Sequence, residues 1–159
     1  MATLYGEVIA PAQRFAYLLC ANGDDAAELA QEAFVKAYAR VSHLEDPSAV
    51  QAYLRKTIVN LVRGRGRKRR VERVYAHLFE QRHDTAARAQ EVPDDALWCA
   101  LDRLSTRQRA ALVLRYYMDF SEQQTAETLG CSVPAVKSLT ARGMRILRSA
   151  LEEAPDDAR

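Results

Sequence analysis

The side chains best placed to do chemistry are the basic ones near the C-terminus. Lys137, Arg142, Arg145 and Arg148 recur three to five residues apart, and the segment 131–151 contains no acidic residue. On an α-helix this spacing directs basic side chains to one face. Guanidinium and ammonium groups gathered on one face are suited to bind phosphate. The pattern predicts contact with nucleic acid, and the alternative is a solvated basic face on an ordinary helical hairpin.

Two helices separated by a tight turn are needed to present such a face. Ser121 can cap the first helix, and Gln124, three residues later, completes a capping box. Gly130 can end that helix, because a residue without a Cβ adopts the left-handed conformation at low cost. Ser132 then starts the second helix, with Pro134 in the first turn, where a missing N–H loses no intrahelical partner. These signals predict a helix-turn-helix.

The second of these helices has a predicted buried side and a predicted exposed side. Its buried side is expected to carry Val136, Leu139, Gly143, Ile146, Leu147 and Ala150. Residues near the start of the second helix of a helix-turn-helix face base edges, so Lys137 and Ser138 are expected to read the sequence. Arginines further along, such as Arg148, more often hold phosphates. The residues predicted to bind DNA here are Ser132, Pro134, Lys137, Ser138, Arg142 and Arg145.

A second basic stripe is predicted in the first half of the chain. A helix is expected to start at Pro47, with Ser48 and Gln51 as its capping box. Its polar face aligns Lys56, Asn60, Arg63 and Arg67. The sequence RGRGRKRR occupies residues 63–70, and each of its two glycines lowers helix stability by about 1 kcal/mol relative to Ala. We therefore expect the helix to fray there into a flexible basic arm.

Apolar residues recur with helical period along almost the whole chain. The 159 residues, 48% of them hydrophobic, can bury one sizeable core or two small ones. We predict an all-α fold with two small helical domains joined by a flexible linker, the C-terminal domain containing the helix-turn-helix. The predicted units are residues 1–70, a linker at 71–92, a second domain at 93–151 and an acidic tail at 152–159. Asp24 or Asp25 is expected to cap the second helix of the first domain.

Charge is distributed unevenly, although the net charge is only +2. The segment 63–73 holds seven basic residues and one acid, whereas the segment 84–102 holds five acids. This asymmetry indicates a protein that meets nucleic acid on one surface and a different partner on another.

Several function classes are excluded on the sequence alone. No apolar run reaches the roughly 18 residues of a membrane-spanning helix, and no signal peptide is evident, so a cytoplasmic location is expected. No nucleophile, base and orienting group occur at a spacing typical of catalysis, so we expect no enzyme and no cofactor. The cysteines are predicted to be buried, reduced thiols: Cys20, Cys99 and Cys131. The histidines are predicted to lie on the surface and to bind no metal: His43, His77 and His83.

Three stretches together resemble the extracytoplasmic-function sigma factors of bacterial RNA polymerase, and among them the SigE-like actinobacterial group. DDAAELAQEAFVKAY (24–38) is similar to the helix that contacts the polymerase clamp. LRKTIVNLVRGRGRKRR (54–70) is similar to the stretch that recognises and helps open the minus-ten promoter element. Residues 104–148, which include the helix-turn-helix, resemble the domain that reads the minus-thirty-five element.

The resemblance implies partners and roles for individual residues. It implies binding to core RNA polymerase, at its clamp and flap regions, through Asp25, Glu28, Gln31 and Glu32. It implies that the promoter strand near the transcription start is held by Lys56, Asn60, Arg63 and Arg67. Amide and guanidinium groups suit that task, because they hydrogen-bond unstacked bases and phosphates. An anti-sigma factor is a further possible partner.

Three residues depart from the usual family pattern: Pro134 and Ala135 replace the common Gly and Thr, and Leu139 replaces a frequent Arg. The resemblance therefore leaves the preferred promoter sequence open.

Two alternatives remain at this point. One is an autonomous helix-turn-helix regulator that binds operator DNA as a dimer. Such a dimer needs two half-sites about one helical turn apart, whereas a sigma factor recognises two unlike elements. The other is a structural RNA-binding protein that binds through the arginine-rich arm. This hypothesis explains the arginines but gives no role to the ordered second half.

Overall fold

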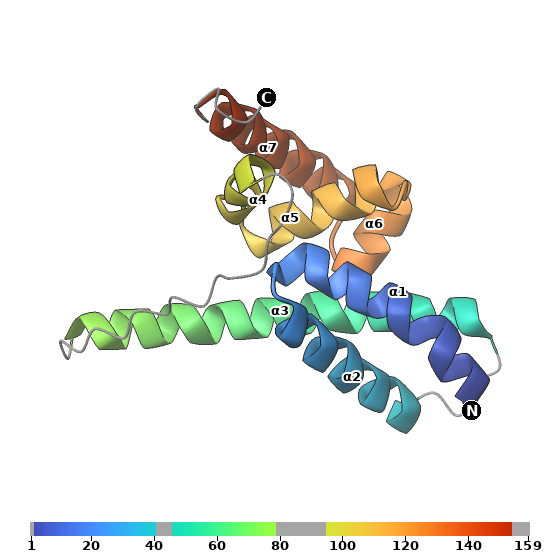
Figure 1. Cartoon of the computed structure of the whole chain (residues 1–159). Helices are drawn as coiled ribbons and strands as arrows, with labels where there is room; N and C mark the ends of the chain where they lie inside the picture. The colour runs from blue at the N-terminus through green and yellow to red at the C-terminus, as the bar shows by residue number, and fades with distance from the viewer. Residues whose placement is uncertain (1, 41–45, 79–94, 154–159) are drawn as a thin grey trace.

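The computed structural model describes residues 2–40, 46–78 and 95–153, and every regular element within these ranges is a helix. The helices are α1 (Ala2–Cys20), α2 (Gly23–Arg40), α3 (Pro47–Leu78), α4 (Asp95–Asp102), α5 (Thr106–Leu112), a π-helical turn η1 (Val113–Tyr117), α6 (Glu122–Leu129) and α7 (Val133–Glu152). The predicted all-α class is confirmed. Figure 1 shows α3 running through the middle of the molecule, with α2 below it, α4–α7 above it and α1 crossing it.

The first half of the chain forms a three-helix unit. Its largest buried side chains include Val8 of α1, Leu29 of α2, and Leu54 and Ile58 of α3, each at most 1% exposed. The structure keeps Pro11 inside α1.

Two of the predicted helix caps in this half are wrong. At the start of α2, the side-chain oxygen of Asn22 accepts a hydrogen bond from the Asp25 N–H at 2.9 Å, and Asp25 lies in the first turn. At the start of α3, a carboxylate oxygen of Asp46 accepts from both the N–H and the hydroxyl of Ser48, at 2.9 and 2.7 Å. In both places a residue slightly earlier in the chain provides the acceptor for the orphan N–H groups.

The predicted fraying at RGRGRKRR is also wrong, because α3 continues without interruption to Leu78. Arg65, between the two glycines, forms ion pairs with carboxylates of α2. These contacts and the high helix propensity of Arg and Lys oppose the cost of the glycines. Most of the predicted linker, 79–92, lies outside the described residues, and so do His43 and His83; the side chain of His77 is not described either.

The second half contains the predicted helix-turn-helix, formed by α6 and α7. The capping box is present: the Ser121 hydroxyl accepts from the Gln124 N–H at 3.1 Å, and the Gln124 side chain accepts from the Ser121 N–H at 2.9 Å. Gly130 ends α6 with φ = +62°, the left-handed conformation that its sequence position predicted. Ser132 caps α7 and accepts from the Ala135 N–H at 3.3 Å.

The two halves pack against each other through a continuous apolar core. Ala110, Ala111, Val113, Leu114 and Leu129 of the second half belong to the same buried cluster as the core of the first half. The two predicted helical units are thus joined by a shared apolar core. It arises because α3 has two apolar sides, one covered by α1 and α2 and the other by the second half.

Polar contacts reinforce this junction. Arg109, 5% exposed, donates from Nε to the Leu18 carbonyl oxygen at 2.6 Å and pairs with Asp102 at 3.2 Å. Its guanidinium lies 5.4 Å from the ring centroid of Trp98, which contacts Tyr17 edge-on at 5.3 Å. Arg109 therefore joins α5 to the end of α1.

The prediction of buried cysteines is wrong in part. Cys99 is exposed, whereas the next residue of α4, Ala100, is buried. Cys20 and Cys131 are half-buried, and all three cysteines are free. Burial raises the pKa of the Cys20 thiol above its ordinary value, and its Sγ donates to the Asn22 carbonyl at 3.3 Å.

Candidate nucleic-acid interface

The basic face of α7 is exposed as its periodicity predicted. Ser132, Pro134, Lys137, Arg142 and Arg145 are exposed, and Ser138 is half-buried. On the opposite side Val136, Gly143 and Ala150 are buried, and the other three residues of the predicted buried side are half-buried. Capping at Ser132 fixes where α7 starts, and hence which residues share each face. The structure therefore presents the predicted DNA-binding residues on one accessible surface.

A shallow groove of about 670 Å³ runs along this face. Lys137, Thr140, Arg145 and Arg148 line it from α7, and Tyr116 of η1 lines it from the other side. The side chain of Tyr116 is 64% exposed. The π-helical turn shifts the register of the last residues of this helix, which a fixed helical period cannot anticipate.

The chemistry of this groove suits a phosphate backbone. Lys137 pairs with Glu122, with 3.6 Å between Nζ and the carboxylate, and the lysine side chain is 63% exposed. An exposed ion pair of this kind contributes little to stability, and a phosphate oxygen readily replaces the carboxylate beside the lysine. The lining therefore offers a polyanion three cationic side chains and three hydroxyl groups, beside a single carboxylate, Glu152.

The second basic stripe follows the outer side of α3. Lys56, Asn60 and Arg67 are exposed and Arg63 is half-buried. Because α3 is uninterrupted, the spacings of four, three and four residues place all four side chains on one face. Tyr53, the aromatic residue nearest to this stripe in sequence, is half-buried and packs against the core.

Arg55 on the same helix serves the junction of the two halves. Its guanidinium carbon lies 5.1 Å from the ring centroid of Phe120, at the start of the helix-turn-helix segment. Burial lowers the pKa of Arg55, although an arginine remains charged at neutral pH. Arg55 thus contributes a cation–π contact between the halves.

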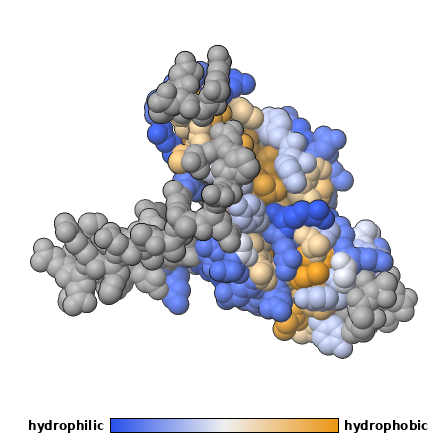
Figure 2. Space-filling view, viewed as in Figure 1, coloured by the Kyte–Doolittle hydropathy of each residue, from blue (hydrophilic) through white to orange (hydrophobic). Residues whose placement is uncertain are grey.

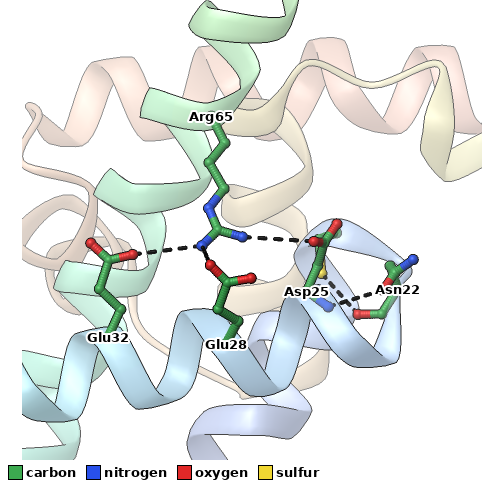
Figure 3. A network of polar contacts seen from close by, with 6 residues as sticks. Asn22, Asp25, Glu28, Glu32 and Arg65 are labelled. Carbon is green, nitrogen blue, oxygen red and sulfur yellow. Dashed lines mark hydrogen bonds and ion pairs between the residues drawn. The ribbon is translucent and has the colours of Figure 1, made fainter. Parts of the chain in front are cut away.

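Three of the four predicted acidic-surface residues converge on one arginine (Figure 3). Arg65 of α3 lies 3.7 Å from Asp25, 2.8 Å from Glu28 and 3.6 Å from Glu32, measured between guanidinium nitrogens and carboxylate oxygens. Gln31, the fourth predicted residue, is exposed on α2.

Sequence reasoning missed the role of Arg65 because it ended α3 at the glycines. Continuing the helix by 100° per residue would have placed Arg65 on the same side as the buried Leu54 and Ile58.

Within the described residues, no helix combines the length and the apolar character needed to cross a bilayer. On the face drawn in Figure 2, apolar residues form separate patches within a mainly hydrophilic surface.

Comparison with known proteins identifies both halves. Residues 4–72 match the family model of sigma-70 region 2, and residues 94–147 match that of sigma-70 region 4. The chain is 33% identical to the RNA polymerase sigma-E factor of Streptomyces avermitilis over 135 residues, covering 85% of this chain and 75% of the relative. It is 31% identical to the ECF RNA polymerase sigma factor EcfG of Rhodopseudomonas palustris, covering 86% and 77%.

A solved structure extends the likeness to the fold. The sigma factor RpoE of Bartonella quintana, crystallised with the anti-sigma factor NepR, matches with a TM-score of 0.66 at 25% identity. The match covers 95% of this chain and 96% of the other, so it includes both halves. The chain therefore belongs to the extracytoplasmic-function sigma factors of RNA polymerase.

Proposed function

We propose that this sigma factor divides promoter recognition between its two basic faces and binds core polymerase through the acidic side of α2. The observation that carries the proposal is the exposed basic face of α7, which has no acidic residue before Glu152 in its last turn, on a capped helix-turn-helix. Dissociable subunits of this kind do not themselves catalyse a reaction, and RNA synthesis belongs to the polymerase.

The upstream contact is assigned to α7. Lys137 and Ser138, near its start, read base edges of the minus-thirty-five element, and Arg142 and Arg145 hold phosphates. Ser132 and Pro134 at the first turn approach the backbone, where the helix N-terminus favours negative charge. The exposure of these side chains and the basic groove beside them support the assignment.

The downstream contact is assigned to α3. Lys56, Asn60, Arg63 and Arg67 follow the promoter strand at the minus-ten element, where the duplex opens. Their alignment on one face of a continuous helix supports this role, because a strand can follow that face across several turns. No stacking role is assigned to Tyr53, since it packs against the core.

The polymerase contact is assigned to Asp25, Glu28, Gln31 and Glu32. They lie on consecutive turns of α2, and three of them present carboxylates to one site. Electrostatic complementarity of this kind gives specificity and speeds association. An anti-sigma factor is a further proposed partner, on the model of the related RpoE–NepR complex. Working with RNA polymerase places the protein in the cytoplasm.

A run-off transcription assay tests the proposed function. Purified core polymerase is given a fragment from upstream of the protein's own gene, with and without the chain. A transcript from a defined start only in the presence of the chain supports the proposal. Polymerase-independent binding to a palindrome without a transcript would instead indicate a dimeric regulator.

Charge-reversal variants separate the surfaces. Arg142→Glu with Arg145→Glu is expected to weaken binding to a minus-thirty-five duplex while leaving affinity for polymerase unchanged. Glu28→Lys with Glu32→Lys is expected to weaken assembly with polymerase. If the double arginine variant lost DNA binding and polymerase binding equally, the assignment of these two functions to separate surfaces would be contradicted. If the double glutamate variant bound polymerase with unchanged affinity, the acidic surface would not be the polymerase contact.

A further inference from the structure

Arg65 occupies the centre of the acidic surface proposed to bind polymerase. Figure 3 shows its side chain reaching from α3 towards α2, where Glu32, Glu28 and Asp25 approach the guanidinium from three successive positions. The shortest contact, 2.8 Å between Nη2 and Glu28 Oε1, is also a hydrogen bond. A cation is thus already bound at the site that a polymerase cation would use.

This internal ion cluster is accessible to solvent. The side chains of Arg65 and Asp25 are each 29% exposed, that of Glu32 is 40% exposed, and that of Glu28 is 67% exposed. Pairs with this exposure are weak, since water and salt compete for both partners. The carboxylates can therefore exchange Arg65 for an external cation without unfolding α2 or α3.

A cation of α2 itself also contacts this cluster. Lys36, one turn further along α2, pairs with Glu32 at 2.9 Å. Its relation to Glu32 is an ordinary contact between neighbouring turns of one helix. Arg65 differs because it comes from another helix and contacts all three acids.

We propose that Arg65 is an intramolecular competitor for the polymerase-binding carboxylates, and that the surface accepts a basic side chain of the polymerase in the place of this guanidinium. The inference rests on the proposed function and deepens it by naming the chemistry of the partner group. Free sigma factor holds the three acids partly neutralised by Arg65, and the incoming lysine or arginine displaces it.

The competition has a measurable consequence for affinity. Removing Arg65 takes away a positive charge that faces the three acids, so the negative potential that faces the partner increases. Removing an exposed cation that faces three carboxylates is expected to change the affinity for polymerase by about threefold to tenfold. The change must shrink as salt is raised, because both the internal and the external contacts are electrostatic.

The test titrates fluorescently labelled full-length chain with core RNA polymerase. Arg65→Met is expected to bind about threefold to tenfold more tightly than the native chain at 0.1 M salt, with a smaller difference at higher salt. Arg65→Lys is expected to fall between the two, because an ammonium group cannot hold two carboxylates with the planar fork of a guanidinium. Arg40→Met is the matched control: it removes an exposed positive charge from the last turn of α2.

Circular dichroism verifies that the variants keep their helix content, and Arg65→Lys carries the test if Arg65→Met does not fold. Unchanged or weaker binding by a folded Arg65 variant would overturn the proposal, and so would an equal gain in Arg40→Met. The glutamate reversals distinguish the two levels of failure. If they weaken binding while the Arg65 variants do not strengthen it, only the competitor role fails. If they have no effect, the acidic surface itself is not the contact.

Discussion

Replacing Arg109 by Met is expected to destabilise the junction between the two halves of the molecule. Arg109 is the buried cation of that junction, and its Nε donates to the Leu18 carbonyl at 2.6 Å. Loss of a hydrogen bond from a charged group costs about 1.5–3 kcal/mol. The ion pair with Asp102 adds at most about 1 kcal/mol, because that carboxylate is 31% exposed and screened by solvent. The expected loss of stability is therefore about 2–4 kcal/mol.

Urea denaturation followed by two probes measures this loss. Trp98, the single tryptophan of the chain, reports on the junction, and far-ultraviolet circular dichroism reports on total helix content. For a chain of this length the loss corresponds to a fall of roughly 4–16 °C in Tm. We also expect Trp98 emission to move to longer wavelength, because the ring loses the cation above it and gains water.

Arg103→Met is the matched control for Arg109→Met. Arg103 pairs with Glu153 at 2.6 Å, but both side chains are more than half exposed. Its replacement is expected to change stability by less than about 1 kcal/mol. Similar unfolding midpoints for the Arg103 and Arg109 variants, with unchanged Trp98 emission, would refute the reasoning that Arg109 holds the two halves together.

Three further predictions concern caps, the groove and pH. Ser121→Ala removes the α6 cap and is expected to cost about 1 kcal/mol in chemical denaturation, with weaker upstream-element binding. Tyr116→Phe deletes only a hydroxyl group from the α7 groove, and it is expected to weaken binding to a minus-thirty-five duplex severalfold in an anisotropy titration. Tyr117→Phe is the control, because Tyr117 is 67% exposed and does not line that groove, and no effect on binding is expected. Hydrogen bonds from the Ser48 hydroxyl and N–H hold the pKa of Asp46 below its ordinary value. The stabilisation that this cap gives to the folded state is therefore complete above the unfolded pKa of about 3.9, and it is lost as pH falls through the lower folded pKa. Asp46→Ala is expected to remove this part of the pH dependence of the free energy of unfolding.

Local structure could be predicted from the sequence where it depends on residues three or four positions apart. The capping box at Ser121, the left-handed Gly130 and the basic face of α7 all follow from such short-range relations. The same reasoning failed where two neighbouring acceptors compete, as at Asn22 and Asp25, because spacing alone does not decide which of them caps the helix.

In the candidate site, too, short-range relations could be predicted and other features could not. Exposure of Lys137, Arg142 and Arg145 could be predicted, since it depends on the period of one helix with a strongly apolar opposite side. The exposure of Tyr116 could not, because a π-helical turn changes the register locally.

By itself the sequence determined the helical class, the helix-turn-helix and the positions of both basic stripes, because each rests on local propensity and on the direction of side chains around one helix. Only the tertiary structure decided that Arg65 reaches the acids of α2 and that Arg109 reaches the Leu18 carbonyl. These contacts join residues 37 and 91 positions apart. They depend on how whole helices pack, and packing is decided by the combined burial of many apolar side chains rather than by any short pattern.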